Sequence, residues 1–306
     1  KVAFEAVSYA KGIAQQTDQK VVAIAVNADL PETLGQYGAD RVYNVQSDAL
    51  ANFNALAYAE LFESIFAKEE AQTAVIPTTA NGKYFASLLA GKIDAGYINN
   101  AVALPEGDDL TLKTTVFTNK AFAKTGFATE KRIIGLSNNA YGVRENPTSA
   151  EVIDFTPDFS EATQKVQVAS VDKNKDKVSI ADAEIVVSAG RGLKGPENWG
   201  MVEELAEVLG AATACSKPVS DMGWRPHSEH VGQTGKPVAT NLYIAIGISG
   251  AIQHLAGINA SKVKVVINND PEAPFFKAAD YGIVGDAFEV VPQLITKLKD
   301  FKAKNA

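Results

Sequence analysis

One stretch of the chain constrains its fold more than any other: residues 242–254, with the sequence LYIAIGISGAIQH. It opens with an apolar run of strand length that ends abruptly at Ser249-Gly250, and a helix-compatible segment follows at once. A helix start leaves backbone N–H groups unpaired and carries the positive end of the helix dipole, so it attracts phosphate. The stretch therefore predicts a strand, a glycine turn and a phosphate-binding helix start. The polar loop Gly232-Gln-Thr-Gly235 just upstream predicts a wall of the same site.

The rest of the sequence predicts two α/β domains. Strand-like and helical patterns alternate at the start, residues 95–145 are β-rich with little helical signal, and a second alternating unit begins at Ala183. Strands separated by helices imply mainly parallel sheets with covered faces. We therefore expect residues 1–170 to form an N-terminal α/β domain with an antiparallel addition or a sheet edge, and residues 171–306 a Rossmann-like domain. The polar, turn-rich residues 146–180 are the expected interdomain connection.

Composition excludes several classes of function. A net charge of −7 argues against a nucleic-acid partner, because phosphate neutralisation needs a basic face. No apolar run approaches the roughly 20 residues of a membrane span, so no membrane insertion is expected. The single cysteine, Cys215, suits a reducing compartment. The chain begins without Met and already inside a helical pattern, so we expect that residues are missing before Lys1 and that any targeting signal is unreadable.

No metal site is expected. Asp172, Asn174 and Asp176 imitate the start of a calcium-binding loop, but Lys177 stands where that loop needs glycine. The three histidines show no metal-binding spacing with the cysteine.

A glycine-rich motif precedes the first helix of the second unit. Residues 190–195, GRGLKG, match the dinucleotide fingerprint G-x-G-x-x-G between a strand and a helix. The acidic residue expected about 20 positions later is missing, because that place holds Cys215, Ser216 and Lys217. The motif leaves two interpretations open: contact with a nucleotide, or a tight strand-to-helix turn.

Other candidate chemistry is weaker. Residues 247–251 approach the G-x-S-x-G elbow of serine hydrolases, but His254 lies only five residues after Ser249, where it is poorly placed as a base. His227 and His230 are expected in surface loops, whereas His254 suits either packing or a polar ligand edge.

Two polar residues end strands of the second unit. Ligands of open α/β sheets lie outside the carboxyl ends of the strands, so Asn268 and Asp286 are candidate ligand contacts. Helix capping is the alternative role for both.

The second half of the chain closely resembles the alpha subunit of electron transfer flavoproteins. The resemblance covers most of residues 185–292 and is most specific in the stretch 242–254. It also rests on segments 188–194, 231–235, 267–274 and 279–286. The first half fits the family's N-terminal domain more loosely. The family usually begins with a strand that precedes the point where this chain starts.

The resemblance implies FAD in the C-terminal domain and a set of residues that hold it. Arg191 would contact the nucleotide portion, Ser216 and Gln233 would line the flavin site, and Thr234 would lie near flavin N5. His254 would lie near the pyrimidine carbonyl. The complete expected set is Arg191, Ser216, Lys217, Val231, Gly232, Gln233, Thr234, Ser249, Gly250, Ala251, Ile252, Gln253, His254, Asn268 and Asp286, the last two holding the adenosine.

The resemblance further implies an electron carrier without a chemical substrate of its own. It would work as a heterodimer with a beta subunit, take electrons from flavin-dependent dehydrogenases such as those of fatty acid β-oxidation (acyl-CoA dehydrogenase), and pass them to a quinone-linked oxidoreductase. The compartment would be bacterial cytoplasm or mitochondrial matrix. Alternatives are an NADH-oxidising, electron-bifurcating flavoprotein and a non-redox nucleotide-binding module. Many family members carry Arg where this chain has Lys217. The local charge stays positive, but a compact ammonium replaces a planar, delocalised guanidinium.

Overall fold

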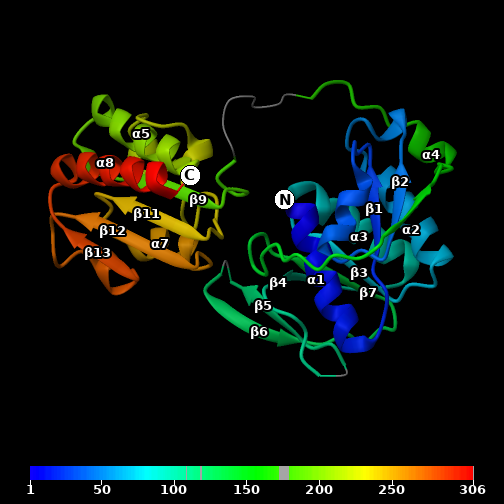
Figure 1. Ribbon diagram of the computed structural model, residues 1–306. Helices are drawn as coiled ribbons and strands as arrows, with labels where there is room; N and C mark the ends of the chain where they lie inside the picture. Colours follow the sequence, from blue (N-terminus) through cyan, green and yellow to red (C-terminus); the bar gives the residue numbers. More distant parts are fainter. Residues whose placement is uncertain (108, 118, 172–178, 306) are drawn as a thin grey trace. The chain divides into compact units, whose positions relative to one another are not determined.

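The computed structural model describes residues 1–107, 109–117, 119–171 and 179–305. The chain divides into two compact units: Lys1–Val116 with Phe122–Lys173, and Phe117–Ala121 with Asn174–Ala306. The predicted boundary at residue 170 stays a prediction. The calcium-like run falls mostly on residues 172–178, outside the described part of the chain. Both units are built on sheets flanked by helices, so the predicted α/β fold class is confirmed (Figure 1).

The first unit contains two sheets. One is parallel, in the order β1-β2-β8, and the other has the order β3-β7-β4-β5-β6. In the second sheet β3 and β4 pair parallel with β7, whereas β4 pairs antiparallel with β5, which confirms the predicted antiparallel addition. The elements are α1 (Val2–Thr17), β1 (Val22–Val26), η1 (Pro31–Tyr37), β2 (Arg41–Val45), η2 (Asp48–Leu50), α2 (Ala55–Lys68), β3 (Thr73–Pro77), α3 (Ala80–Ile93), β4 (Gly96–Ala101), β5 (Leu112–Val116), β6 (Ala121–Thr125), β7 (Arg132–Leu136), β8 (Glu151–Asp154) and α4 (Glu161–Gln164).

Strand β8 lies in the polar, turn-rich segment 146–180 that we expect to connect the domains, and it was not predicted as a strand. The strand has four residues, three of them exposed, so it shows neither an apolar run nor an alternating pattern. It forms because its backbone pairs in parallel with β2. Polar side chains strengthen the pairing: Arg41 Nε contacts Glu151 Oε2 at 2.9 Å, and Asn44 Nδ2 donates to Asp154 Oδ1 at 2.8 Å.

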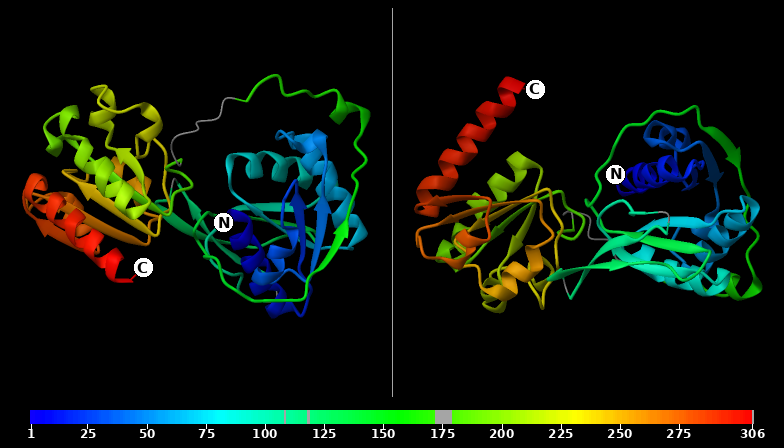
Figure 2. Two further views of the ribbon diagram at one scale, coloured as in Figure 1. Left: turned by 45° about the horizontal axis from the view of Figure 1, so that its top comes forward. Right: turned by 90° about the horizontal axis from the view of Figure 1, so that it is seen from below.

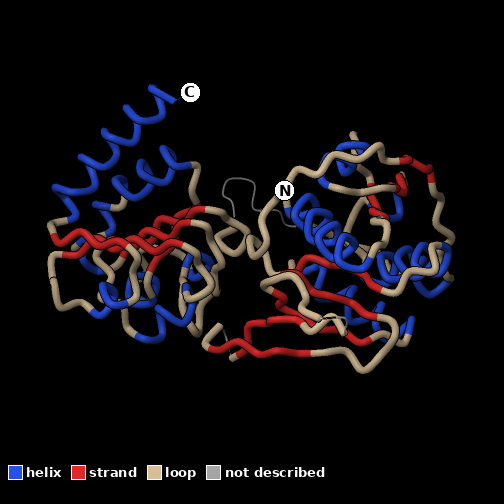
Figure 3. The backbone as a smooth tube through the Cα atoms, turned by 60° about the horizontal axis from the view of Figure 1, so that its bottom comes forward, coloured by secondary structure: helices blue, strands red, loops and turns tan. Residues whose placement is uncertain are grey.

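The second unit is one parallel sheet in the order β10-β9-β11-β12-β13. Its helices cover both faces of the sheet (Figure 3). The elements are β9 (Ile185–Ala189), η3 (Arg191–Leu193), η4 (Pro196–Asn198), α5 (Gly200–Leu209), β10 (Ala212–Cys215), α6 (Lys217–Asp221), η5 (His227–Glu229), β11 (Leu242–Ile246), α7 (Ile252–Ile258), β12 (Val263–Asn268), η6 (Pro274–Lys277), β13 (Tyr281–Val284) and α8 (Ala287–Asn305).

Apolar clusters on the two faces of this sheet form its core. On one face, α5 and α8 pack through residues such as Leu205 and Val291 against Val187 and Ile246. On the other face, α7 and η6 close the core around Tyr243. Helix α8 continues past the sheet, as the right-hand view of Figure 2 shows in red.

The strand order places a ligand site in this unit. The chain moves from β9 outward to β10, then returns to β11 on the other side of β9 and continues to β12 and β13. The loops after β9 and β11 therefore leave the sheet in opposite directions. In open α/β sheets the crevice at such a point, outside the carboxyl ends of the strands, is where ligands bind.

Candidate functional site

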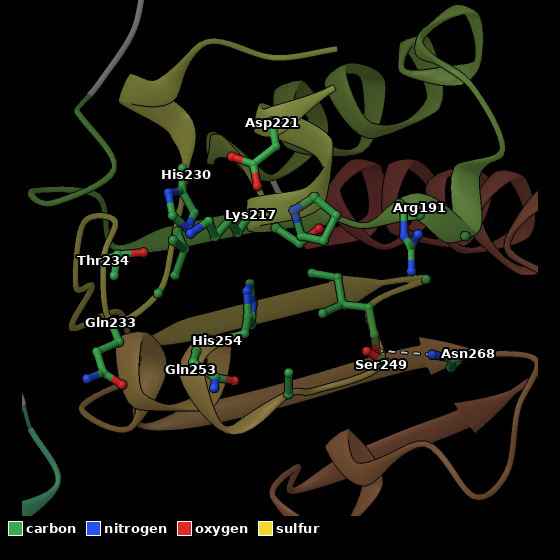
Figure 4. A pocket seen from close by; sticks show the side chains of 18 of the residues that line it. Arg191, Lys217, Asp221, His230, Gln233, Thr234, Ser249, Gln253, His254 and Asn268 are labelled. Carbon is green, nitrogen blue, oxygen red and sulfur yellow. Dashed lines mark hydrogen bonds between the residues drawn. The ribbon is translucent and has the colours of Figure 1, made fainter. Parts of the chain in front are cut away.

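A cavity of about 570 Å³ lies at the carboxyl ends of β9, β10, β11 and β12. All of the predicted cofactor-binding residues line it except Gly250, Ile252 and Asp286. Figure 4 shows Gln233 and Thr234 at the opposite end from Arg191, with His254 between them. The four loops that sequence analysis singled out separately thus converge on one cavity.

The glycines of the G-x-G-x-x-G motif bring the loops after β9 and β11 together. Gly192 N–H donates to Gly247 O at 3.1 Å. A Cβ at Gly190 would lie 2.3 Å from Gly247 O, and one at Gly192 would lie 2.6 Å from Gly247 Cα. These glycines serve the close approach of two backbones, and the same approach leaves Arg191 and Gly192 on the cavity wall.

The turn after β11 has its glycine for two reasons. Gly250 has φ +86°, and a Cβ there would lie 2.5 Å from Phe275 N. Phe275 N–H donates to Ser249 O at 3.0 Å, which fixes the turn against η6. Helix α7 then starts at Ile252 with no side-chain cap at Ala251. Ile252 itself is exposed and lies outside the cavity lining.

The polar loop after η5 is fastened to α7. Gln233 N–H donates to Gln253 O at 2.7 Å. A Cβ at Gly257 would lie 2.6 Å from Gly232 Cα, so the loop backbone sits directly on the helix. Thr234 is exposed, and its hydroxyl has no partner within the described part of the chain. The loop therefore presents uncommitted polar groups at a fixed place.

Two cations and a serine occupy the loops after β9 and β10. Arg191 and Lys217 line the cavity and make no ion pair with any residue that the structure describes. Ser216 precedes the short helix α6 but its side chain makes no capping hydrogen bond. Cys215, one residue earlier, is fully buried, and burial raises the pKa of its thiol to about 12, so it stays an unreactive thiol.

His254 is the most deeply buried polar group of the cavity wall, with 6% of its surface exposed. Burial, together with the nearby His230, lowers the pKa of its imidazole to about 4, so the ring is neutral near pH 7. Its Nε2 lies 2.9 Å from the hydroxyl oxygen of Tyr243, a core residue of β11. Of the two roles left open for His254, the structure shows the packing role, and the polar ligand edge stays a prediction.

The two polar residues at strand ends behave differently. Asn268 lines the cavity, but its Nδ2 donates to Ile248 O at 3.0 Å and its Oδ1 accepts from Asp270 N–H at 3.0 Å. Asp286 lies outside the cavity lining and caps α8, with Oδ1 accepting from Phe288 N–H at 2.9 Å. Both side chains therefore hold nearby backbone in place through these hydrogen bonds. Contact of either side chain with a ligand stays a prediction.

Several lining residues were missed by sequence reasoning. The expectation that His230 sits in a surface loop is wrong: it is 4% exposed and lines the cavity, because the residue pairs in a short parallel bridge with Cys215. The others are Gly192, Pro218, Asp221, Gly247, Ile248 and Asp270. The usable signal for His230 was its place just before Val231 and the polar loop that starts at Gly232.

The described residues contain neither a metal-binding cluster nor a membrane-spanning helix. Over the described ranges, no group of His, Cys, Asp and Glu side chains could hold a metal ion. Across those same ranges, no helix is long and apolar enough to cross a membrane.

The parallel sheet, the crossing point between β9 and β11 and the cation-bearing cavity together define an α/β domain that binds a nucleotide cofactor. Residues 1–160 match the family described as electron transfer flavoprotein domain, and residues 179–259 match the electron transfer flavoprotein FAD-binding domain. The chain belongs to the electron transfer flavoprotein alpha-subunit family.

Full-length relatives agree with this assignment. The alpha subunit of Syntrophomonas wolfei is 38% identical, with 98% of this chain and 95% of that protein covered. That of Bacillus subtilis is 37% identical, with 97% and 93% covered. A rice protein, "electron transfer flavoprotein subunit alpha, mitochondrial", is 35% identical, with 84% and 73% covered.

The cavity fits the family's cofactor, FAD. Its volume lies within the roughly 300–1,000 Å³ of ordinary ligand pockets. Arg191 and Lys217 supply positive charge without partners of their own, as a pyrophosphate requires. Ser216, Gln233 and Thr234 supply neutral hydrogen-bonding groups. The second unit is thus the FAD-binding domain of an electron-transferring subunit.

Proposed function

We propose that this chain is the alpha half of a heterodimeric electron carrier that accepts electrons from flavin-dependent dehydrogenases, acyl-CoA dehydrogenases among them, and delivers them to a quinone-linked oxidoreductase. The beta subunit is the other half. The relatives' names call each of them a subunit, which supports a partner. We place the protein in bacterial cytoplasm, or in the mitochondrial matrix if its source is eukaryotic.

The observation that carries the proposal is the uncommitted state of the cavity's polar groups. Arg191, Lys217 and Thr234 have no partner within the described ranges, while nothing around them is arranged for covalent catalysis. Ser249 is exposed at a turn, and the nearest histidine on its helix is already engaged by Tyr243. The side chains are suited to hold a cofactor and tune it, which is the protein's share of the work in a cofactor-dependent electron carrier.

The proposed roles follow the geometry of the cavity. FAD, when bound, supplies the electron-carrying chemistry. Arg191 would hold the nucleotide portion from the loop after β9, and the turn from Ser249 to Gln253 would hold the pyrophosphate. Gln233 and Thr234, at the other end of the cavity, would face the ring, with His254 beside them.

Co-expression with the beta subunit, an absorption spectrum and a reductive titration test the proposal. We expect a yellow heterodimer that is reduced by an acyl-CoA dehydrogenase with its substrate and reoxidised by a quinone-linked oxidoreductase. A colourless protein that takes up no FAD would identify a non-redox nucleotide-binding module instead. A second flavin together with oxidation of NADH would identify a bifurcating carrier.

A further inference from the structure

His230 is a buried side chain of the cavity wall whose polar atoms are open. Only 4% of its surface is exposed, and the residue lines the cavity. Neither ring nitrogen makes a hydrogen bond with a residue that the structure describes, and neither is closed off from water as Nδ1 of His254 is. Polar side chains this deeply buried are nearly always hydrogen-bonded, so a partner inside the cavity has to satisfy these nitrogens.

The polar loop fixes the place of this imidazole. Lys236 N–H donates to His230 O at 2.8 Å, which closes the loop on itself. Two glycines make room for the ring: a Cβ at Gly235 would lie 2.8 Å from its Cγ, and a Cβ at Gly232 would lie 3.4 Å from its Nε2. The imidazole therefore rests on the loop that carries Thr234. Figure 4 shows both side chains at the same end of the cavity.

Charged and titratable groups surround the ring on three elements. Helix α6 contributes one charge of each sign, Lys217 and Asp221, while η5 contributes His227 and α7 contributes the neutral His254. The two fixed charges act on the imidazole in opposite directions, and burial lowers its pKa below the ordinary value. His230 is therefore neutral near pH 7 as long as no further charge enters the cavity.

The remaining charges near this loop are already paired. Glu229, the residue before His230, forms an ion pair of 2.7 Å with Arg225, whose guanidinium also contacts Glu203 at 3.1 Å. These pairs neutralise one another on the side of η5. A charge added inside the cavity thus acts on the imidazole with little compensation from this side.

Among the three histidines, His230 alone offers the cavity a nitrogen that can take up a proton. Histidine is the side chain whose charge changes near neutral pH. His227 lies outside the cavity lining, with Nδ1 3.1 Å from the hydroxyl of Ser220. In His254, Nε2 lies against Tyr243 and Nδ1 is closed off from water. A negative charge in the cavity therefore draws a proton to His230.

We propose that His230 is a proton-binding residue of the cavity, which takes a proton from solvent onto a ring nitrogen when reduction makes the bound cofactor negative. The inference deepens the proposed function and rests on it, because the negative charge is that of a reduced flavin. Full reduction brings two electrons from the dehydrogenase and one proton to the flavin ring, which leaves one negative charge. A second proton goes to His230, no bond between heavy atoms forms or breaks, and the net charge of the cavity stays constant.

Nitrogen-15 NMR of the histidine rings tests the inference. The full chain, labelled in its three histidines, is combined with unlabelled beta subunit and FAD and titrated over about pH 5 to 8, first oxidised and then fully reduced without oxygen. We expect a neutral His230 near pH 7 in the oxidised protein. Reduction should raise the ratio of protonated to neutral His230 about tenfold or more, as a nearby opposite charge does. The same titration curve in both states would overturn the inference, as would a ring that is protonated in both.

His230→Gln keeps a polar side chain but removes the titrating ring. It assigns the His230 signals, and it should reduce the number of protons taken up per flavin on reduction by up to about one, measured with an indicator dye in weak buffer. Equal proton uptake in the two proteins would contradict the proposed role. His227→Gln, at an exposed histidine outside the cavity lining, is the matched control and should leave the uptake unchanged.

The two hypotheses fail in different ways. A protein that binds no FAD contradicts the proposed function and, with it, the inference. A protein that binds and reduces FAD while His230 titrates unchanged contradicts the inference alone. If His230→Gln does not fold, His227→Gln and His254→Gln assign the other two histidines, and the remaining signals in the unmodified chain still decide the question.

Discussion

Polar side chains serve different purposes in the two units of this protein. In the first unit Glu5, 2% exposed, accepts hydrogen bonds from three backbone N–H groups: Asn139 at 2.9 Å, Tyr141 at 3.0 Å and Gly142 at 2.8 Å. Tyr9, also fully buried, donates to a backbone carbonyl at 2.8 Å. These side chains complete the hydrogen bonding of distant backbone, so they hold α1 to the chain around residue 140.

In the second unit the polar groups around the cavity are left open. Arg191, Lys217 and Thr234 have no partner among residues with a described position, and Nδ1 of His254 has none of standard geometry. Arg191, Lys217 and Thr234 are exposed, so water or a ligand can satisfy them, whereas Nδ1 of His254 is buried, where polar groups in native proteins are nearly always satisfied. In this protein, polar side chains whose hydrogen bonds are made within the chain stabilise the fold. Polar side chains that line one cavity and have no partner in the chain are the candidates for binding a ligand.

Removing Glu5 should produce the largest loss of stability. Glu5→Ala leaves three backbone N–H groups without their acceptor, at about 1–3 kcal/mol each, so the first unit should lose about 3–9 kcal/mol. Both tryptophans, Trp199 and Trp224, belong to the second unit. Circular dichroism in denaturant should therefore show an earlier transition of the first unit, whereas tryptophan fluorescence should change far less.

The matched control for this change is Glu145→Ala, at an exposed glutamate of the same unit. It should leave both transitions within about 0.5 kcal/mol of the unmodified chain. If Glu5→Ala behaves like this control, the three backbone contacts do not stabilise the unit, and the contrast between the units fails.

Lowering the pH should destabilise the second unit through His254. Its pKa of about 4 in the folded chain lies below the ordinary 6.5, so between these values the unfolded chain binds a proton that the folded chain does not. Stability is therefore lost as the pH falls from about 6.5 to about 4, by roughly 3 kcal/mol at most. Tryptophan fluorescence in denaturant, without FAD, measures this loss.

His254→Gln isolates that effect, because its side chain does not titrate. The difference in stability between the unmodified chain and this variant should shrink steadily over the same pH range. His230 is also buried, and burial lowers its pKa, but it is present in both proteins, so only its coupling to His254 remains in the difference. Two stability curves that run parallel from pH 6.5 to pH 4 would rule out a neutral, buried His254.

A change at the turn after β11 should weaken FAD binding about tenfold or more. Gly250→Ala places a Cβ at φ +86° and 2.5 Å from Phe275 N, so the turn beside the cavity must move. Gly210→Ala is a close match, because Gly210 has φ +64° but open space around its missing Cβ. Titration with FAD should show a loss for Gly250→Ala alone, and equal losses in both variants would assign the effect to general strain.

Much of this arrangement follows from the sequence because apolar runs and glycines report directly on buried strands and close approaches. The stretch 242–254 contains both, and it predicted β11, its turn and α7 nearly to the residue. Strand β8 could not be predicted in the same way, since its existence depends on pairing with β2 rather than on its own pattern. Helix α6, with five residues, is likewise too short to show a period.

The site shows the same division. Gln233 and Thr234 lie in a glycine-flanked polar loop that stands out in the sequence, and they line the cavity. His230 was misjudged because its burial results from a bridge to Cys215, a contact between segments that no local pattern encodes. Asp286 was expected at the ligand because it ends a strand, but the same place also starts a helix, and its carboxylate caps that helix.

The smallest effect we predict comes from Lys217. Its ammonium is exposed at the cavity and unpaired within the described residues, so it favours negative charge on a bound, reduced flavin through a solvent-screened attraction. Lys217→Ala should lower the flavin's reduction potential by roughly 10–20 mV at low salt, and by less at high salt. Lys217→Arg should keep the potential close to that of the unmodified protein, and Lys297→Ala, on α8 outside the cavity lining, should leave it unchanged. Equal potentials for the unmodified protein and Lys217→Ala would show that an open cation beside the cavity need not act on its occupant, and would limit the contrast between the two units to groups that are also buried.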